Sequence, residues 1–234
     1  MNIRVLGIIP ARGGSKGVTR KNVRKVAGKP LIQWTIEAAT RSKLLTDFYV
    51  STDSAEIAAV AKSCGSKVFI RPMDLAQDNT PMIPSVQHAL SEAENINGKY
   101  DYFILLQPTA PQRTYMDIDN SISILNKNKG IDSVISVYQV EDNHPSRMYT
   151  QKKGLLQKYA EEPEGALRQD LDKVYLRNGA IYLCRRDLLV LRGALIGSRC
   201  AAYEMSKECS SNIDDEIDLD IASLMLKIQY NIES

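Results

Sequence analysis

Hydrophobic residues along this chain fall into two alternating patterns. Short apolar runs, typical of buried strands, alternate with segments whose apolar positions recur every three to four residues, as on one face of a helix. Pro30 is expected at the first position of a helix and Ser54 at the cap of the next. The predicted strands are 3–9, 48–50, 67–70, 102–106, 132–140, 180–183 and 201–205, and the predicted helices are 31–40, 54–61, 85–93, 116–125, 187–191 and 216–230.

This alternation predicts a three-layer α/β fold, in which helices cover both faces of a mainly parallel central sheet. Ligands of such sheets bind beyond the carboxyl ends of the strands. Polar segments 10–18, 51–53, 71–72 and 107–109 each follow a predicted strand. We therefore expect them to meet at one edge of the sheet.

The alternation stops between about residues 141 and 176. This segment contains His144-Pro145 and scattered charges but no complete βα unit. We interpret residues 1–234 as a single domain and 141–176 as an inserted arm, which either folds over the site or reaches another subunit.

Composition excludes several classes of protein. The 234 residues carry a formal net charge of +2 with both signs interspersed, so neither nucleic acid nor a membrane surface is expected as a partner. The N-terminus lacks a signal-peptide pattern, and no apolar run is long enough to span a membrane. The cysteines form no Cys-x-x-Cys motif and are expected to be free thiols in a reducing cytosol, which favours a cytoplasmic protein. They are Cys64, Cys184, Cys200 and Cys209.

The first predicted strand runs into a glycine-rich, basic loop over residues 10–18, with Arg20-Lys21-Asn22 shortly after it. Its spacing matches neither the Gly-x-x-x-x-Gly-Lys-Ser/Thr loop nor the Gly-x-Gly-x-x-Gly dinucleotide motif. Glycines let backbone N–H groups approach phosphate oxygens, and fixed cations favour the same ligand. The loop therefore indicates a polyphosphate site, although a basic surface turn has a similar composition.

The run Ala-Arg-Gly-Gly-Ser-Lys-Gly over 11–17, followed by Lys21-Asn22, resembles the N-terminal signature of the sugar cytidylyltransferases that make CMP-activated nonulosonic acids. These are the sialic acid synthetases and their legionaminic and pseudaminic relatives. Segments 71–78, 105–114, 168–182 and 211–218 are similar to further motifs of that family, in the same order. Each alone has a structural explanation, such as a turn or a helix N-terminus. Together they favour the family and imply its nucleotide-diphospho-sugar transferase type of fold.

The resemblance implies a nucleotide site around the glycine loop. Arg12 and Lys21 are the expected catalytic cations, which would neutralise the β- and γ-phosphates and the leaving pyrophosphate. Because both belong to a solvent-facing loop, replacing either by Ala is expected to cut turnover and barely change stability. The expected nucleotide-binding residues are Ala11, Arg12, Gly13, Gly14, Lys16, Lys21, Asn22 and Arg71.

On the acceptor side, the resemblance implies binding of a nine-carbon 2-keto sugar acid. Arg168 is the expected partner of its carboxylate, because a guanidinium matches two oxygens at once. Gln107 is expected to bind sugar hydroxyls or the substituent. Asn178 belongs to the same sugar-binding stretch, and Tyr182 either forms part of an acyl pocket or is a buried structural residue.

The segment before the last helix resembles a metal-binding motif. Where the family usually has Asp-Ile-Asp, this chain has Asn212-Ile213-Asp214. Asp214 is the first expected Mg²⁺ ligand and candidate base, Asn212 is a weakened ligand, and Asp215 is a compensating one. Alternatively, Asn212 caps the last helix.

The resulting hypothesis is that CTP and a nonulosonic acid react with Mg²⁺ to give a CMP-sugar and pyrophosphate. The anomeric hydroxyl would attack the α-phosphorus directly, and His88 and His144 would be structural. Relatives with the arm are homodimers, so a homodimer is expected. The alternatives are a nucleotidyltransferase for another sugar or a sugar 1-phosphate, and a non-catalytic nucleotide-binding subunit.

Overall fold

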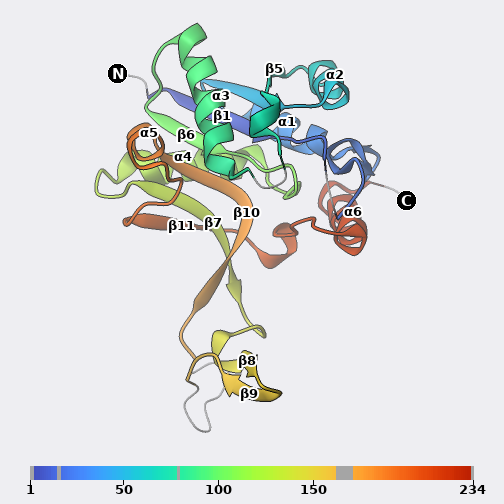
Figure 1. Ribbon diagram of the computed structural model, residues 1–234, viewed down its shortest axis with the longest axis vertical. Helices are drawn as coiled ribbons and strands as arrows, with labels where there is room; N and C mark the ends of the chain where they lie inside the picture. Colours follow the sequence, from blue (N-terminus) through green and yellow to red (C-terminus); the bar gives the residue numbers. More distant parts are fainter. Residues whose placement is uncertain (1–2, 15–16, 78–79, 162–170, 233–234) are drawn as a thin grey trace.

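A computed structural model describes residues 3–14, 17–77, 80–161 and 171–232 (Figure 1). Its central sheet has seven strands in the order β11-β7-β10-β6-β1-β4-β5. β10 is antiparallel to its neighbours β6 and β7, and the other pairs are parallel, so the prediction of a mainly parallel sheet is confirmed. The strands are β1 Val5–Pro10, β4 Asp47–Thr52, β5 Lys67–Ile70, β6 Tyr102–Leu105, β7 Ser133–Val140, β10 Val174–Arg185 and β11 Cys200–Glu204.

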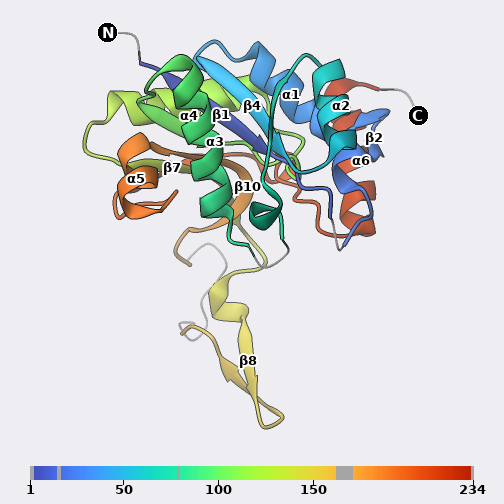
Figure 2. The same ribbon diagram turned by 45° about the horizontal axis from the view of Figure 1, so that its top comes forward.

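Helices cover both faces of this sheet, as Figures 1 and 2 show. Along β1, Val5 and Ile9 belong to the apolar cluster that includes residues of α1, α2 and α4, whereas Leu6 and Ile8 pack with α3 and α5. A strand buried on both faces needs this continuous apolar sequence. The predicted three-layer arrangement is therefore confirmed. The helices are α1 Leu31–Arg41, α2 Ala55–Ser63, α3 Met82–Asn97, α4 Tyr115–Lys127 and α5 Arg186–Arg192.

A third apolar cluster connects the two ends of the chain. The last helix, α6 Glu216–Tyr230, packs Leu219 and Leu226 against Leu31 and Trp34 at the start of α1. The small β2–β3 hairpin, Lys25–Val26 with Lys29–Pro30, lies in the same cluster. This packing holds the segment before α6 close to the glycine loop. The short 3₁₀ helices are η1 Lys21–Val23, η2 Met73–Leu75, η3 Pro145–Arg147 and η5 Lys207–Cys209.

The inserted arm projects from the body (Figures 1 and 2). It is built from the outer ends of β7 and β10 and carries the hairpin of β8 Tyr149–Lys152 and β9 Leu155–Lys158. β10 begins at Val174, well before the predicted strand start at residue 180, and its pairing with β7 shifts register between Arg177 and Tyr182. The boundary predicted at 176 therefore falls inside a strand.

Two helix starts differ from the sequence prediction. α3 begins at Met82 rather than residue 85, because Pro84 fits in a first turn, where the missing N–H has no helical partner. Pro30 is the N-cap of α1 rather than its first residue. The predicted cap by Ser54 is confirmed, since its hydroxyl accepts from the Ile57 N–H at 3.4 Å.

The cysteines are free, as expected; Cys184 is buried and the other three are partly exposed. Across the described residues, we find no helix with the length and apolar character that crossing a bilayer demands.

Candidate active site

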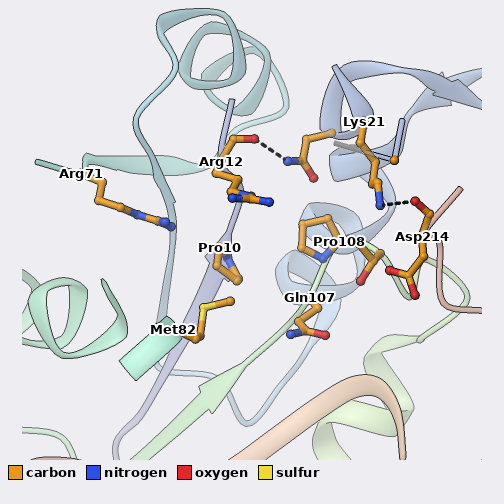
Figure 3. Close-up of a pocket in the computed structure, with 11 residues that line it drawn as sticks. Pro10, Arg12, Lys21, Arg71, Met82, Gln107, Pro108 and Asp214 are labelled. Carbon is orange, nitrogen blue, oxygen red and sulfur yellow. Dashed lines mark hydrogen bonds between the residues drawn. The ribbon is translucent and has the colours of Figure 1, made fainter. Parts of the chain in front are cut away.

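A cavity of about 330 Å³ lies where β1 and β6 end, beside the start of α3 and the segment before α6 (Figure 3). The polar segments that follow strands do meet at this edge of the sheet. Arginine and lysine side chains lie along one part of the wall, and an amide and a carboxylate complete it. The lining residues are Pro10, Arg12, Gly17, Lys21, Asn22, Arg71, Met82, Gln107, Pro108, Thr109 and Asp214.

The start of the glycine loop is fastened to the end of β4. The Ala11 N–H donates to the Ser51 carbonyl at 2.9 Å, and the Gly13 N–H donates to Asp53 Oδ1 at 3.0 Å. These two amides are thus already used within the protein, and the Ala11 side chain is fully buried. Ala11 and Gly13 therefore shape the loop through these hydrogen bonds. The expectation that their backbone N–H groups contact phosphate is not supported. A Cβ on Gly14 would meet nothing within 4 Å, so that part of the loop is open.

The far end of the loop rests on the segment before α6. Lys21 Nζ donates to the carbonyls of Ile213 and Asp214, at 2.6 and 3.3 Å, and Figure 3 shows the second contact. A Cβ on Gly17 would lie 2.0 Å from the Asp214 carbonyl oxygen, so only glycine fits there without displacing backbone. The Ile213 N–H donates to the Thr109 carbonyl at 2.9 Å. The loop, the end of β6 and the segment carrying Asp214 therefore form one connected unit.

Asn22 and Arg71 support the part of the cavity wall that carries the arginine and lysine side chains. Asn22 is 7% exposed and its Nδ2 donates to the Arg12 carbonyl at 3.0 Å (Figure 3). Arg71 is 6% exposed and donates from Nη2 to the Ser51 carbonyl at 3.0 Å. Both line the cavity and also hold the backbone that shapes it.

Positive charge accumulates at this wall. Burial lowers the pKa of Arg71 from its usual value, Asp53 opposes that shift, and neighbouring Arg12 adds to it. A guanidinium stays charged over the physiological range even so. Arg12, Arg71 and Lys21 thus bring three cations to the cavity, where an anionic ligand would relieve their mutual repulsion.

The other wall joins the end of β6 to the register shift in β10. Gly179 has φ +76°, and a Cβ there would lie 2.9 Å from Gln107 Oε1 and 3.4 Å from Asn212 Oδ1. The amides of Gln107 and Asn212 therefore approach the same glycine. These three residues come from widely separated parts of the sequence, and Gln107 lines the cavity as predicted.

Asn178 does not take the expected position. It is 2% exposed, and its Nδ2 donates to Ser210 Oγ at 2.9 Å while its Oδ1 accepts from Ser136 Oγ at 2.6 Å and from the Ala180 N–H at 3.2 Å. Its amide is satisfied inside the protein. The placement does not support a direct sugar contact, and we assign Asn178 to holding the register shift in β10. Tyr182 is half-buried and packs against the apolar cluster that contains Leu6 and Ile8. This placement fits both expectations for Tyr182, a part of an acyl pocket and a structural residue.

The segment before α6 offers one carboxylate to the cavity. Asp214 lines it, and its Oδ2 accepts from Asn212 Nδ2 at 3.2 Å. Asp215 is the N-cap of α6, because its Oδ1 accepts from the Asp218 N–H at 2.9 Å in a capping box. Capping by Asn212 is therefore wrong, and Asp215 is engaged by the helix rather than by the cavity. Among the described residues, no group of three or more His, Cys, Asp or Glu lies close enough together to hold a metal ion.

Two contributors were missed by sequence reasoning. Asp53 was recognised only as part of a turn, yet it holds Gly13. Arg113 is 1% exposed, and its Nη1 donates to the carbonyls of Ala180 and Gln107 at 2.8 and 3.3 Å. Burial lowers the pKa of Arg113 to about 10. The available signal was that Arg113 belongs to the same segment 105–114 as the Gln-Pro-Thr turn, but local spacing does not reveal that this cation points inward.

Lys16 and Arg168 lie outside the described residues, so their expected contacts remain predictions. His144 bonds locally, with Nδ1 2.8 Å from Ser146 Oγ, and His88 lies in α3. Neither histidine lines the cavity described above.

Residues 6–226 match the family model described as cytidylyltransferase. The chain belongs to this family. It is 32% identical over 228 residues to an N-acylneuraminate cytidylyltransferase of Escherichia coli, an alignment covering 95% of this chain and 52% of that protein. It is also 32% identical over 225 residues to the post-translational flagellin modification protein B of Campylobacter coli, covering 95% of each. N-acylneuraminate cytidylyltransferase A of Danio rerio is 33% identical over 93% of this chain and 50% of its own length.

The chain therefore spans about half the length of the E. coli and Danio rerio relatives. Among solved structures, a CMP:2-keto-3-deoxy-manno-octonic acid synthetase complexed with CTP matches with a TM-score of 0.73 at 17% identity, covering 97% of this chain and 99% of that one. A 4-diphosphocytidyl-2C-methyl-D-erythritol synthase from Anaerococcus prevotii matches with a TM-score of 0.66 at 13% identity, covering 97% of each. These two likenesses support the fold.

Proposed function

We propose that this member of the cytidylyltransferase family transfers CMP from CTP to a nonulosonic acid and releases pyrophosphate. One observation carries the proposal: a single cavity has cations of the glycine loop on one wall and Gln107 and Asp214 on the other. A triphosphate fits the first wall by charge, and a polyhydroxylated acid fits the second by hydrogen bonding. The names of the sialic-acid-activating relatives point to the same pair of substrates.

On the nucleotide side, Arg12 and Lys21 would stabilise negative charge as it moves onto the departing pyrophosphate. Nucleotidyl transfer depends mainly on such positioning and electrostatic stabilisation. An ammonium has three N–H donors. Two of those of Lys21 are directed at the carbonyls of Ile213 and Asp214, which fixes its position in the cavity wall before substrate binds. Pre-positioned charge needs no reorganisation during the reaction.

On the acceptor side, the anomeric hydroxyl oxygen forms a bond to the α-phosphorus, and the bond from that phosphorus to the bridging oxygen of pyrophosphate breaks. The hydroxyl proton needs an acceptor. Asp214 contributes its carboxylate to the cavity wall, and we propose that it accepts this proton. Asn212 Nδ2, which donates to Asp214 Oδ2, would hold the carboxylate in position.

Mg²⁺ is the cofactor we propose. Asp214 and the amide oxygen of Asn212 fit this group, since Mg²⁺ in nucleotide sites is held by one or two protein oxygens together with substrate phosphates. Asp215 does not fit as well, because its carboxylate caps α6. When bound, Mg²⁺ would neutralise phosphate charge. The residues of the chain would orient the triphosphate and the attacking hydroxyl.

The carboxylate of the acid is assigned to Arg168 and its acyl substituent to the neighbourhood of Tyr182. The support is the family resemblance of segment 168–182, together with the position of Gly179 against Gln107 and Asn212. Asn178, which holds the backbone beside Gly179, would act indirectly by positioning that wall.

The arm would form a homodimer contact. Its hairpin exposes apolar side chains that a monomer would leave in water: Leu155 and Leu156 are 72% and 68% exposed, and Tyr159 is 66% exposed. A projecting segment with this surface, and with no apolar core among its described residues, favours an intermolecular partner.

Pyrophosphate release tests the function. The protein is incubated with CTP, Mg²⁺ and one acceptor at a time from a panel of sialic, legionaminic and pseudaminic acids, 2-keto-3-deoxy-manno-octonic acid and a sugar 1-phosphate. We expect release with one of the nine-carbon acids. Release with the sugar 1-phosphate alone would overturn the acceptor class, and CTP binding without release from any acceptor would overturn the enzymatic proposal.

A further inference from the structure

The last helix, α6, has two apolar faces. Leu219, Ala222 and Leu226 are buried against the body of the protein. On the outer side, four aliphatic residues form what we call the α6 stripe: Ile217, Ile221, Leu224 and Ile228, exposed by 70%, 49%, 58% and 62%. A surface helix normally presents charged or polar residues to water opposite its buried face. The described residues of the chain therefore leave this apolar face of α6 exposed to water.

The spacing within the stripe indicates what covers it. Steps of four, three and four residues keep the side chains on one side of the helix and correspond to a repeat of 3.5 residues. That repeat is the pattern of a seam between two packed helices. At a rise of about 1.5 Å per residue, the stripe runs along roughly 16 Å of the helix. It is therefore a partner for another helix of similar length.

Charge beside the stripe favours one orientation of that partner. Asp220 and Lys227 each directly precede a stripe residue and so lie along the same edge. If a second α6 packs antiparallel, with Ile217 opposite Ile228 of the other copy, Lys227 of each copy comes beside Asp220 of the other. In a parallel pair the acidic starts of the helices, which also contain Glu216, would come together and repel. A twofold axis perpendicular to the helices generates this antiparallel pair.

We propose that the α6 stripe docks against the α6 stripe of a second copy of this chain as an antiparallel helix pair. In Figures 1 and 2, α6 lies at a side of the body well apart from the β8–β9 hairpin. This contact therefore uses a different surface from the arm contact, so the two together would join dimers into a tetramer. Specific stable interfaces bury about 800 Å² per partner. Four side chains form only the centre of such an area, which predicts a weaker, concentration-dependent contact.

Sedimentation equilibrium tests the proposal. We compare the wild-type protein with the stripe variant Ile221→Gln/Leu224→Gln and the control Ile96→Gln, which changes an exposed aliphatic residue of α3 outside the stripe. The stripe variant removes four apolar side chains from a twofold contact, and the dissociation constant is expected to rise roughly 100-fold. The control should behave as wild type. Equal masses for wild type and stripe variant at all concentrations would overturn the proposal and leave another protein as the occupant.

A charge exchange tests the orientation. Lys227→Glu places like charges across the antiparallel pair and should weaken association, whereas Asp220→Lys/Lys227→Glu restores opposite charges and should recover it. Failure of the double exchange to recover association would contradict the antiparallel arrangement. Because each readout is mass and needs no substrate, failure here is distinguishable from failure of the proposed enzymatic function.

Discussion

Replacing Lys21 by Met separates its two roles, because the aliphatic stem remains and the ammonium is lost. A position in a solvent-facing loop would by itself predict almost no loss of stability. The structure predicts a loss, because Lys21 Nζ donates to the Ile213 carbonyl at 2.6 Å and to the Asp214 carbonyl at 3.3 Å. A hydrogen bond from a charged donor contributes about 1.5–3 kcal/mol, and the longer, exposed bond adds little. We therefore expect Lys21→Met to lower the free energy of unfolding by about 2 kcal/mol.

Urea unfolding measures this change in the free energy of unfolding. For a chain of this size, a change of about 2 kcal/mol corresponds to a fall of the melting temperature by about 4–8 °C. Lys25→Met, at an exposed lysine of β2, is the matched control and should leave both quantities nearly unchanged. Turnover of Lys21→Met at saturating CTP should fall by roughly 100-fold or more, from lost charge stabilisation. A variant that unfolds at the same urea concentration as wild type would refute the stabilising contact. Wild-type turnover would refute the catalytic role.

Three further substitutions test other parts of the site. Gly17→Ala places a Cβ 2.0 Å from the Asp214 carbonyl oxygen and should lower the free energy of unfolding in urea by about 1–3 kcal/mol. The control Gly14→Ala, whose Cβ meets nothing within 4 Å, should not lower it, and equal stabilities of the two variants would contradict the close approach. Arg168→Lys should raise the KM for the sugar acid more than that for CTP, and equal changes in initial-rate measurements would count against carboxylate recognition. Asn212→Asp should lower the Mg²⁺ concentration needed for half-maximal rate, and coincident Mg²⁺ titrations would remove Asn212 from the metal site.

The sequence predicts that the site residues come together at one edge of the sheet, because this follows from the topology of the sheet. Parallel strands end at the same edge of a sheet, so the segments after β1 and β6 had to converge once the alternation of strands and helices was recognised. Arg12, Lys21 and Gln107 line one cavity for that reason. The length of β10 could not be predicted in the same way, because residues 174–177 pair with β7 only after the chain has left and returned through the arm.

Polar pairing inside the site was the part that local patterns did not reveal. Spacing suggested that Gly13 offers an amide to phosphate, yet a carboxylate 40 residues away occupies it. Asn178 accepts from Ser136 of β7, Arg113 donates to the Ala180 carbonyl of β10, and Asp215 rather than Asn212 caps α6. For Gly13, Asn178 and Arg113 the partner is chosen by tertiary packing, since a buried donor or acceptor must be satisfied by whatever group the fold brings near. The cap by Asp215 is instead a local contact with Asp218, three residues further along the chain.

In the proposed reaction, one cavity joins CMP to the anomeric oxygen of a sugar acid. Mass spectrometry of a reaction with CTP, Mg²⁺ and the preferred acid, alongside a pyrophosphate assay, tests it most directly. We expect a CMP-sugar ester and pyrophosphate in equal amounts, both strongly reduced in Lys21→Met and retained in Lys25→Met. CTP consumption without the ester, or equal yields from the two lysine variants, would contradict it.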